Sequence, residues 1–221
     1  MSTAVLPSAE PISRGILTYA EAWQMQLALH QQVVSGERGP CILFLEHQAV
    51  LTLGKHSDRA HIIAREHELA ARGVEVVQTD RGGEVTAHMP GQLVIYPILP
   101  LHRLALAPKA YVEKLLHSVI ITLRDFGIEA YSDNQHPGVW VGMKKICAVG
   151  VRIRERVSMH GLALNIDNEL SLFEAIVPCG ISGRGVCSMQ SILGQAPSRS
   201  EVEARFIERF FEVFGWQKMI N

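Results

Sequence analysis

Residues 81–97 read RGGEVTAHMPGQLVIYP, and this stretch organises our interpretation of the chain. Its second half, from Leu93 onward, is an apolar run of strand character, and Pro90-Gly91 marks a turn between two strand-like pieces. The adjacent Gly82 and Gly83 let the backbone approach a ligand closely or take a positive φ. Arg, Glu, Thr, His and Gln beside an apolar strand are typical of a small-molecule pocket. A β-hairpin with polar turn residues is an equally consistent interpretation.

The composition of the chain limits the classes of function it can have. A net charge of −1 over 221 residues argues against a broad electrostatic surface for nucleic acid or membranes. No apolar run is long enough to span a bilayer, and the N-terminus lacks the basic region and apolar core of a signal peptide. We therefore expect a cytoplasmic protein with no nucleic-acid partner and no membrane association.

The cysteines and histidines show no metal-binding pattern. Four cysteines contain no CxxC pair, and ten histidines contain no HExxH sequence. We therefore expect no structural metal, and nothing in the sequence calls for a cofactor.

Hydrophobic periodicity predicts one α+β domain. Helices are predicted from about Thr18 to Val34, from about Glu66 to Arg72, from Pro108 to Phe126 and from about Ser200 to Phe214. Strands are predicted at residues 41–46, 49–53, 74–77, 93–97, 139–141, 145–153 and 157–165. This order indicates a mixed, mainly antiparallel sheet with helices packed on it. Residues 1–13 are expected to form a flexible N-terminal tail, and residues 14–221 a single domain.

Cys179, in the tight turn Pro178-Cys179-Gly180, is the first candidate for chemistry. An exposed thiol in such a turn can act as a nucleophile if a nearby cation lowers its pKa from the usual ~8.5. The alternative is a buried structural thiol, which is common for a lone cysteine. Cys187 competes for the same role, whereas Cys41 and Cys147 lie in apolar strands and are expected in the core.

Lys145 is the second candidate, because it follows Lys144 at the start of an apolar strand. Adjacent strand residues point to opposite faces, so one of the two lysines is expected to face inward. A lysine that faces a pocket can act as general base or acid. The alternative is a solvated lysine at a strand end. His88 and His160 have the same two interpretations, as catalysts or as ordinary hydrogen-bonding partners.

Four blocks of sequence together resemble the lipoyl (octanoyl) transferase family of lipoate biosynthesis. They are Arg81-Gly82-Gly83 with Thr86, His88, Pro90-Gly91-Gln92 and Tyr96-Pro97; Lys145-Ile146 with Gly150; HGLALN at residues 160–165; and Pro178-Cys179-Gly180. They stand in the family's order and span most of residues 45–190. The resemblance implies the fold shared by biotin and lipoate protein ligases and by the catalytic core of class II aminoacyl-tRNA synthetases. It makes residues 14–221 a single catalytic domain.

The resemblance also implies the site and the reaction. Cys179 would be the nucleophile and Lys145 its partner. Contacts with the acyl substrate are implied at Arg81, Gly82, Gly83, Glu84, Val85, Thr86, Ala87, His88, Ala148, Val149, Gly150, Gly161, Leu162 and Ala163. The implied reaction moves an octanoyl group from octanoyl-acyl carrier protein to a specific lysine of a lipoyl domain, through a cysteine thioester. The implied acceptors are lipoyl-domain proteins, namely 2-oxoacid dehydrogenase E2 subunits and the glycine cleavage H protein.

Two residues depart from the family's usual pattern. Met89 stands where Gly is usual, and we expect it to stiffen or narrow the turn. Cys187 stands where Thr is usual before Ser188, and it places a second thiol near the proposed site.

Three other functions are compatible with parts of the sequence. The first is an ATP-dependent lipoate or biotin-protein ligase on the same fold, which would require ATP and Mg²⁺ but no nucleophilic cysteine. The second is a cysteine-dependent amidotransferase, which would take its acyl group from a lipoyl-domain protein. The third is a non-catalytic module that binds carrier proteins without covalent modification of Cys179.

Overall fold

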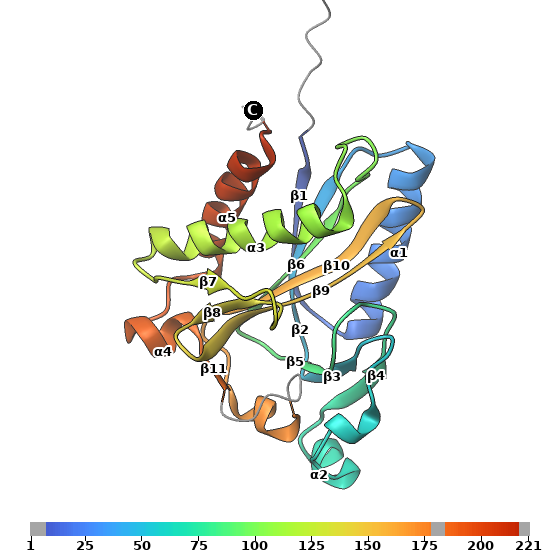
Figure 1. Cartoon of the computed structure of the whole chain (residues 1–221). Helices are drawn as coiled ribbons and strands as arrows, with labels where there is room; N and C mark the ends of the chain where they lie inside the picture. Colours follow the sequence, from blue (N-terminus) through green and yellow to red (C-terminus); the bar gives the residue numbers. More distant parts are fainter. Residues whose placement is uncertain (1–7, 178–183, 217–221) are drawn as a thin grey trace, which may run out of the picture.

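The computed structural model describes residues 8–177 and 184–216 as a large mixed sheet with helices on both faces and a small second sheet beside it (Figure 1). The helices are α1 Tyr19–Ser35, α2 Glu66–Ala71, α3 Pro108–Asp125, α4 Met189–Leu193 and α5 Arg199–Phe214, with 3₁₀ turns at Arg59–His61 and Ser171–Ala175. The strands are β1 Glu10–Leu17, β2 Cys41–His47, β3 Val50–Leu53, β4 Glu75–Gln78, β5 Thr86–His88, β6 Gln92–Ile98, β7 Tyr131–Ser132, β8 Val139–Val141, β9 Lys144–Arg154, β10 Val157–Asn165 and β11 Gly185–Val186.

The strands form the mixed, mainly antiparallel sheet that the sequence predicts. The large sheet has the order β1-β2-β6-β10-β9-β8-β7, with β11 paired to β9, and the small sheet has the order β4-β3-β5. Only the pairs β1/β2, β11/β9 and β3/β4 are parallel among the described strands. The longest antiparallel pairing joins β9 to β10 and sets Ala148 opposite Ala163 and Gly150 opposite Gly161.

The predicted N-terminal tail is wrong for residues 10–13. Strand β1 begins at Glu10, and Glu10 to Ser13 pair with Cys41 to Phe44 of β2. The sequence does not reveal this strand because it lacks an alternating apolar pattern: of its residues only Ile12 is buried, and an edge strand can leave most of its side chains in solvent. Residues 1–7 lie outside the described part of the chain.

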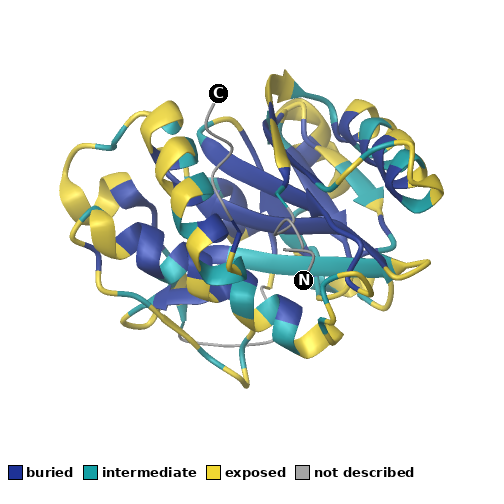
Figure 2. Ribbon diagram, turned by 90° about the horizontal axis from the view of Figure 1, so that it is seen from above, coloured by how far each residue is buried: buried dark blue, intermediate teal, exposed yellow. Residues whose placement is uncertain are grey.

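Helices cover the two faces of the large sheet separately (Figures 1 and 2). Helices α3 and α5 pack on one face, where Tyr111, Leu115 and Phe206 join the apolar side chains of the central strands. Helix α1 covers the opposite face through Ala22, Leu29 and Val33. Because both faces are covered, β2 and β6 are buried almost throughout, as the dark strands in Figure 2 show.

Capping boxes begin the first and last helices. Thr18 accepts a hydrogen bond from the Glu21 amide, and the Glu21 carboxylate accepts one from the Thr18 amide. Ser198 and Glu201 make the same pair of bonds at the start of α5. Each box satisfies amide groups that the first helical turn leaves without a partner.

The stretch at residues 81–97 is not a hairpin. Strand β5 pairs with β3 in the small sheet, whereas β6 pairs with β2 and β10 in the large sheet. The turn at Pro90-Gly91 therefore carries the chain from one sheet to the other. At Gly91, where φ is +86°, an added Cβ would lie 2.6 Å from Asp167 Oδ1, so this crossing requires glycine.

Gly161 is required by the packing of the sheet, and its replacement provides a test of the fold. A Cβ there would lie 2.2 Å from the Ile95 carbonyl oxygen and 2.9 Å from Pro97 Cδ. We expect Gly161→Ala to lower the free energy of unfolding by about 2 kcal/mol, because backbone must move to admit the methyl group. Urea denaturation measures the change.

Gly15→Ala is the matched control, because Gly15 also lies in a strand but has nothing within 4 Å of an added Cβ. Its effect should stay within about 0.5 kcal/mol. Equal losses in the two variants would contradict the register of β10 against β6.

Candidate active site

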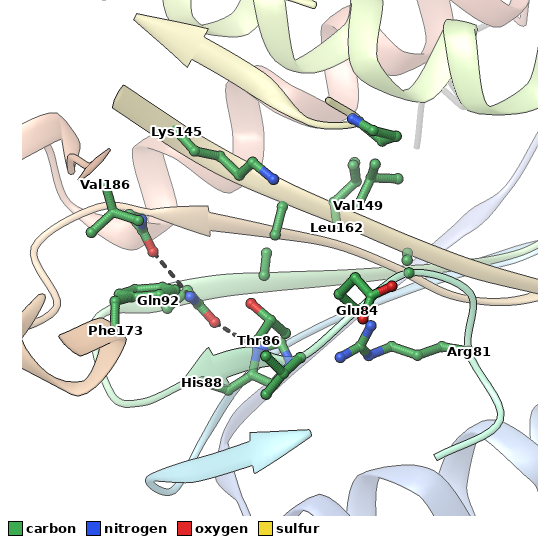
Figure 3. Close-up of a pocket in the computed structure, with 18 of the residues that line it drawn as sticks. Arg81, Glu84, Thr86, His88, Gln92, Lys145, Val149, Leu162, Phe173 and Val186 are labelled. Carbon is green, nitrogen blue, oxygen red and sulfur yellow. Dashed lines mark hydrogen bonds between the residues drawn. The ribbon is translucent and has the colours of Figure 1, made fainter. Parts of the chain in front are cut away.

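A cavity of about 340 Å³ opens between the β9–β10 pair of the large sheet and the small sheet, close to the N-terminus of α1 (Figure 3). Its wall is mainly apolar or small at the centre, where Ala148, Val149, Leu162 and Ala163 lie. Polar side chains line it toward β5 and the loop that precedes β5. A cavity with this division can hold an apolar chain and orient a polar group attached to it.

Most residues predicted to contact the acyl substrate line this cavity. They are Arg81, Gly83, Glu84, Val85, Thr86, His88, Ala148, Val149, Gly150, Gly161, Leu162 and Ala163. Gly82 and Ala87 do not: the Gly82 amide donates to the Val151 carbonyl at 2.9 Å, and Ala87 is buried in the core of the small sheet. The strand alternation of β5 explains Ala87, because its neighbours Thr86 and His88 are the ones that point to the cavity.

The glycines of the site bring backbone segments together. A Cβ on Gly150 would lie 2.8 Å from the Gly82 carbonyl oxygen, and a Cβ on Gly54 would lie 1.8 Å from that of Gly83. The loop at residues 81–84 can therefore lie directly against β9 and β3. The space beside several of these glycines is filled by main chain, so they serve close backbone packing.

Lys145 points into the cavity because of a β-bulge. Trp140 pairs with Lys145 and Val139 pairs with Cys147, so Ile146 is an extra residue in β9. Ile146 and Cys147 consequently both pack in the core beneath α3, and Lys145 shares the cavity face with Ala148. Lys144 is exposed, which confirms that one lysine of the pair faces inward.

The Lys145 amine lies beside an aromatic platform. Its Nζ is 4.9 Å from the centroid of the Trp140 ring, and the Arg184 guanidinium is also 4.9 Å from that centroid. Arg184 in turn donates to Asp133 at 2.9 Å, and the hydrogen bonds from His136 and Arg184 hold the pKa of the Asp133 carboxyl well below its usual range. These two cation–π contacts with Trp140 hold the Lys145 and Arg184 side chains at the side of the cavity formed by β8 and the residue before β11.

Arg81 closes the opposite end of the cavity. Its guanidinium is almost fully buried and donates from Nη2 to the Thr52 carbonyl at 2.6 Å and to Thr52 Oγ1 at 2.9 Å. It also donates to the Gly82 carbonyl at 3.0 Å. A buried cation needs such partners, and these oxygens hold the guanidinium in place at the cavity wall.

Tyr19, His88 and Tyr96 line the cavity near α1, and His47, which does not line it, contacts all three rings. The ring of Tyr19 lies 5.1 Å from that of His47 and 6.3 Å from that of His88. A 2.8 Å hydrogen bond joins His47 Nε2 to the Tyr96 hydroxyl. Burial lowers the pKa of His47 to about 4 and holds that of His88 well below its ordinary value. Burial also raises the pKa of Tyr19 to about 12. These rings are therefore neutral at pH 7.

His160 is held by an acid on a neighbouring loop. Its Nε2–H donates to Asp80 Oδ1 at 2.8 Å, and Asp80 also pairs with Arg152. Burial and the nearby Arg81 and Arg152 cations lower the pKa of His160 to about 3, so its imidazole is neutral. Its backbone has a φ of +55°, an unusual conformation for a residue with a side chain, stabilised by a 2.9 Å bond from its amide to Gln26 Oε1.

Among the described cysteines, Cys41 and Cys147 lie in the core as the sequence predicts, whereas the prediction that Cys187 competes as a nucleophile is wrong. Cys41 and Cys147 are buried in strands, and burial raises their thiol pKa to about 11 and about 12. Cys187 is also buried, with a pKa raised by burial to about 11, so its thiol does not compete as a nucleophile. Cys179 lies outside the described residues, together with the rest of residues 178–183.

Several lining residues were not among the predicted substrate contacts, namely Tyr19, Gln92, Tyr96, Gln135, Pro137, Trp140, Asn165, Phe173, Arg184, Gly185 and Val186. Gln92, Tyr96 and Asn165 belong to the motif blocks, so a polar group on each of these strand residues was an available signal. Tyr19 and Trp140 look like ordinary core residues in sequence. Met89 does not line the cavity; it is buried in the small sheet's core, where Asn168 Nδ2 lies 3.1 Å from its sulfur.

Within residues 8–177 and 184–216, no group of three or more His, Cys, Asp or Glu side chains could hold a metal ion. No helix of the described residues is long and apolar enough to cross a membrane.

Comparison with known proteins places the chain in a family. Residues 18–211 match the model of the lipoyl protein ligase A/B catalytic domain. An octanoyltransferase of Chloroflexus aggregans is 50% identical over 203 residues, covering 90% of this chain and 92% of the relative.

Solved structures show the same fold at low sequence identity. A lipoate-protein ligase A bound with ATP has a TM-score of 0.76 at 16% identity, covering 97% of this chain and 88% of its own. The biotin protein ligase from Aquifex aeolicus has a TM-score of 0.52 at 13% identity, covering 93% of this chain and 68% of its own. The predicted biotin–lipoate ligase-like fold is confirmed.

The neutral state of the buried histidines predicts acid sensitivity. The folded pKa of His47 is about 4, below the ordinary value near 6.5, so the unfolded chain takes up this proton first as the pH falls. His47 then contributes a loss of stability of about 1.4 kcal/mol per pH unit between pH ~6.5 and pH ~4. We expect His47→Gln to reduce the slope of unfolding free energy against pH in this window, measured by urea denaturation at several pH values.

His117→Gln is the control, because His117 is exposed on α3. This variant should retain the wild-type slope. An unchanged slope in His47→Gln would show that His47 is not held neutral by burial.

Proposed function

This chain belongs to the lipoyl protein ligase A/B catalytic domain family, and on that basis we propose that it transfers octanoyl groups from octanoyl-acyl carrier protein to a lysine of lipoyl domains. It is an acyltransferase of lipoylation, like the relatives named octanoyltransferase. Cys179 is the nucleophile and Lys145 is its partner. The acceptors are lipoyl-domain proteins such as 2-oxoacid dehydrogenase E2 subunits and the glycine cleavage H protein, and the reaction takes place in the cytoplasm.

The observation that carries the proposal is the direction of the Lys145 side chain. The bulge at Ile146 turns its amine into a cavity floored by Ala148 and Ala163. Phe173 and Arg184, which flank the turn of Cys179 in sequence, also line that cavity. An amine, a thiol and an apolar channel are the parts that thioester exchange on a fatty acyl chain requires.

The reaction proceeds in two acyl transfers. The Cys179 thiolate attacks the thioester carbonyl of the donor; a carbon–sulfur bond forms, the bond to the carrier's sulfur breaks, and the carrier leaves as a thiolate that takes a proton. The amine of the acceptor lysine then attacks the enzyme thioester, forms the amide and releases the Cys179 thiol. Lys145 as ammonium stabilises the Cys179 thiolate, and as neutral amine it accepts the proton of the incoming lysine.

The main alternative remains an ATP-dependent ligase, because a structure with this fold is a lipoate-protein ligase A bound with ATP. That reaction forms an acyl-adenylate and needs no cysteine. A requirement for ATP and Mg²⁺ with free octanoate as donor would favour it. An amidotransferase on the same fold would instead accept an octanoylated lipoyl domain as donor.

Covalent catalysis is tested by intact-mass analysis after mixing with octanoyl-acyl carrier protein. We expect an octanoyl adduct on the wild-type enzyme and none on Cys179→Ala, because only this thiol forms the thioester. Lys145→Ala should form the adduct at least about 10²-fold more slowly, as expected for the loss of an acid–base group.

Cys187→Ala is the matched control, because its thiol is buried with a raised pKa, and it should form the adduct at the wild-type rate. An adduct on Cys179→Ala, or transfer without any enzyme-bound intermediate, would contradict the two-step mechanism.

The floor of the cavity predicts how chain length is selected. Ala163 lies opposite Ala148 across the β9–β10 pair, and a larger side chain there would occupy space needed by the acyl tail. We expect Ala163→Leu to shift the preferred donor from octanoyl toward hexanoyl or butyryl. Each CH₂ that no longer fits should cost about fourfold in kcat/KM, the equivalent of ~0.8 kcal/mol.

The measurement is kcat/KM for a series of acyl-carrier donors of different length. Ala64→Leu, at a half-buried position outside the cavity, is the control. The same length profile in Ala163→Leu and wild type would show that the tail lies elsewhere.

A further inference from the structure

A chain of buried hydrogen bonds runs along the cavity wall from the Arg81 end toward Lys145. It joins five side chains that are each at most 6% exposed, namely Arg81, Thr52, His88, Gln92 and Asn165. Figure 3 draws its central links, from His88 through Gln92 to the next amide. Burying five polar side chains in an otherwise apolar core costs free energy unless each of them is hydrogen-bonded.

The direction of the central links is fixed by groups that can only accept. Gln92 Nε2 donates to the Ala87 carbonyl at 3.2 Å, so Gln92 Oε1 must face His88. His88 Nδ1 is therefore the donor in their 2.7 Å bond, and its Nε2 carries the lone pair. Gln92 Nε2 also donates to Asn165 Oδ1 at 2.9 Å.

The Arg81 end supports the same direction. A guanidinium only donates, and it donates to Thr52 Oγ1 at 2.9 Å. The Thr52 hydroxyl hydrogen is then available for His88 Nε2, which lies 3.4 Å away. All donors thus point one way, from the buried cation toward Asn165.

The chain ends on the backbone that pairs with Lys145. Asn165 Nδ2 donates to the Cys187 carbonyl at 2.9 Å, and the Cys187 amide donates to the Lys145 carbonyl at 3.0 Å. The carbonyl and the amide of Cys187 are therefore both held by hydrogen bonds. Immediately before it, Val186 pairs with Lys145 in the short strand β11. Strand β11 has only two residues, so the hydrogen bond from Asn165 adds to a short pairing with β9.

We propose that Gln92 and Asn165 are positioning residues, which hold the Cys187 backbone against Lys145 and so fix the Lys145 amine in the cavity. They act through residue 187 and do not touch the reacting atoms. The effect of this placement on catalysis rests on the proposed function, whereas the placement of the Lys145 amine is measurable without substrate.

The first test reverses the polarity of one link. Labelling is done at alkaline pH, where the new carboxyl group of Gln92→Glu is ionised, so a carboxylate oxygen replaces the donor that faces the Ala87 carbonyl and Asn165 Oδ1. Asn165 must turn its NH₂ toward residue 92, and it then presents its oxygen to the Cys187 carbonyl. Lysine amines are pulse-labelled with acetic anhydride and quantified by peptide mass spectrometry, with the exposed neighbour Lys144 as internal reference. We expect the labelling ratio of Lys145 to Lys144 to change at least about threefold, the effect of a lost buried hydrogen bond.

Gln26→Glu is the matched control for this test. Gln26 is also fully buried, its Oε1 accepts from the His160 amide, and it has no hydrogen bond to any member of the chain. Its labelling ratio should equal that of wild type. An unchanged ratio in Gln92→Glu, or an equal change in both variants, would overturn the proposal.

The second test uses Asn165→Asp, in which a single atom differs. Burial raises the pKa of an unpaired carboxyl group, so at acid pH the new O–H can donate to the Cys187 carbonyl, and at alkaline pH an ionised oxygen faces it. The ratio of variant to wild-type kcat should rise at least about fivefold as the pH falls from 8 to 6. His88, Lys145 and Cys187 share the chain or the cavity with position 165, and division by the wild-type value removes their titration.

Kinetic constants separate positioning from direct binding, because Gln92 and Asn165 also line the cavity. Positioning predicts a fall in kcat of about tenfold with KM unchanged, whereas contact with the acyl donor predicts a rise in KM. Each variant is assayed well below its own Tm. A flat pH ratio or a pure KM effect would overturn the proposal.

Failure of the proposed function gives a different result. If octanoyl-acyl carrier protein leaves no adduct on the wild type, the labelling ratios of Gln92→Glu and Gln26→Glu still decide whether the chain positions Lys145.

Discussion

The pairing of β9 with β10 is the constraint on which the rest of the site depends. Its register places Ala148 opposite Ala163 and Gly150 opposite Gly161, which makes a floor of small residues and lets the loop at residues 81–84 lie against β9. The extra residue Ile146 then turns Lys145 onto the same face as that floor. Without the bulge the lysine would point into the apolar core beneath α3, where an amine has no polar partners.

The polar residues around this floor are kept neutral or paired. Burial holds the imidazoles of His47, His88 and His160 in their neutral forms, and Arg81 finds carbonyl and hydroxyl oxygens within the protein. A wall of this kind orients a carbonyl group without placing unpaired charge beside an acyl tail. The hydrogen bonds among Arg81, Thr52, His88, Gln92 and Asn165 also reduce the cost of placing these side chains in the interior.

The fold itself does not choose between thioester exchange and adenylate chemistry. A ligase bound with ATP has the same arrangement of strands at 16% identity, so the reaction must be decided by particular side chains. In this chain the candidates are Lys145, which the bulge at Ile146 turns into the cavity, and Cys179, which follows the 3₁₀ turn at Ser171–Ala175 in sequence. Family relatives of closely similar length are named octanoyltransferase, which agrees with that choice.

The sequence by itself determined the fold class, the main helices and strands, the core cysteines and most of the residues that line the cavity. Periodicity and capping signals are local, so the helix from Tyr19 and the strand from Val157 follow from their own residues. The motif blocks identified Arg81, His88 and Ala163 without any coordinates. Residues 10–13 of strand β1 were predicted as a tail because an exposed edge strand lacks an apolar pattern.

Only the tertiary structure decided which side chains face one another. It separated β5 from β6 into two sheets, removed Gly82 and Ala87 from the cavity wall, and brought Tyr19, Trp140 and Arg184 to it. It also connected Thr52, Gln92 and Asn165 into one hydrogen-bonded chain. The physical reason is that registers, bulges and buried hydrogen bonds join residues far apart in sequence, and no local pattern records those partners.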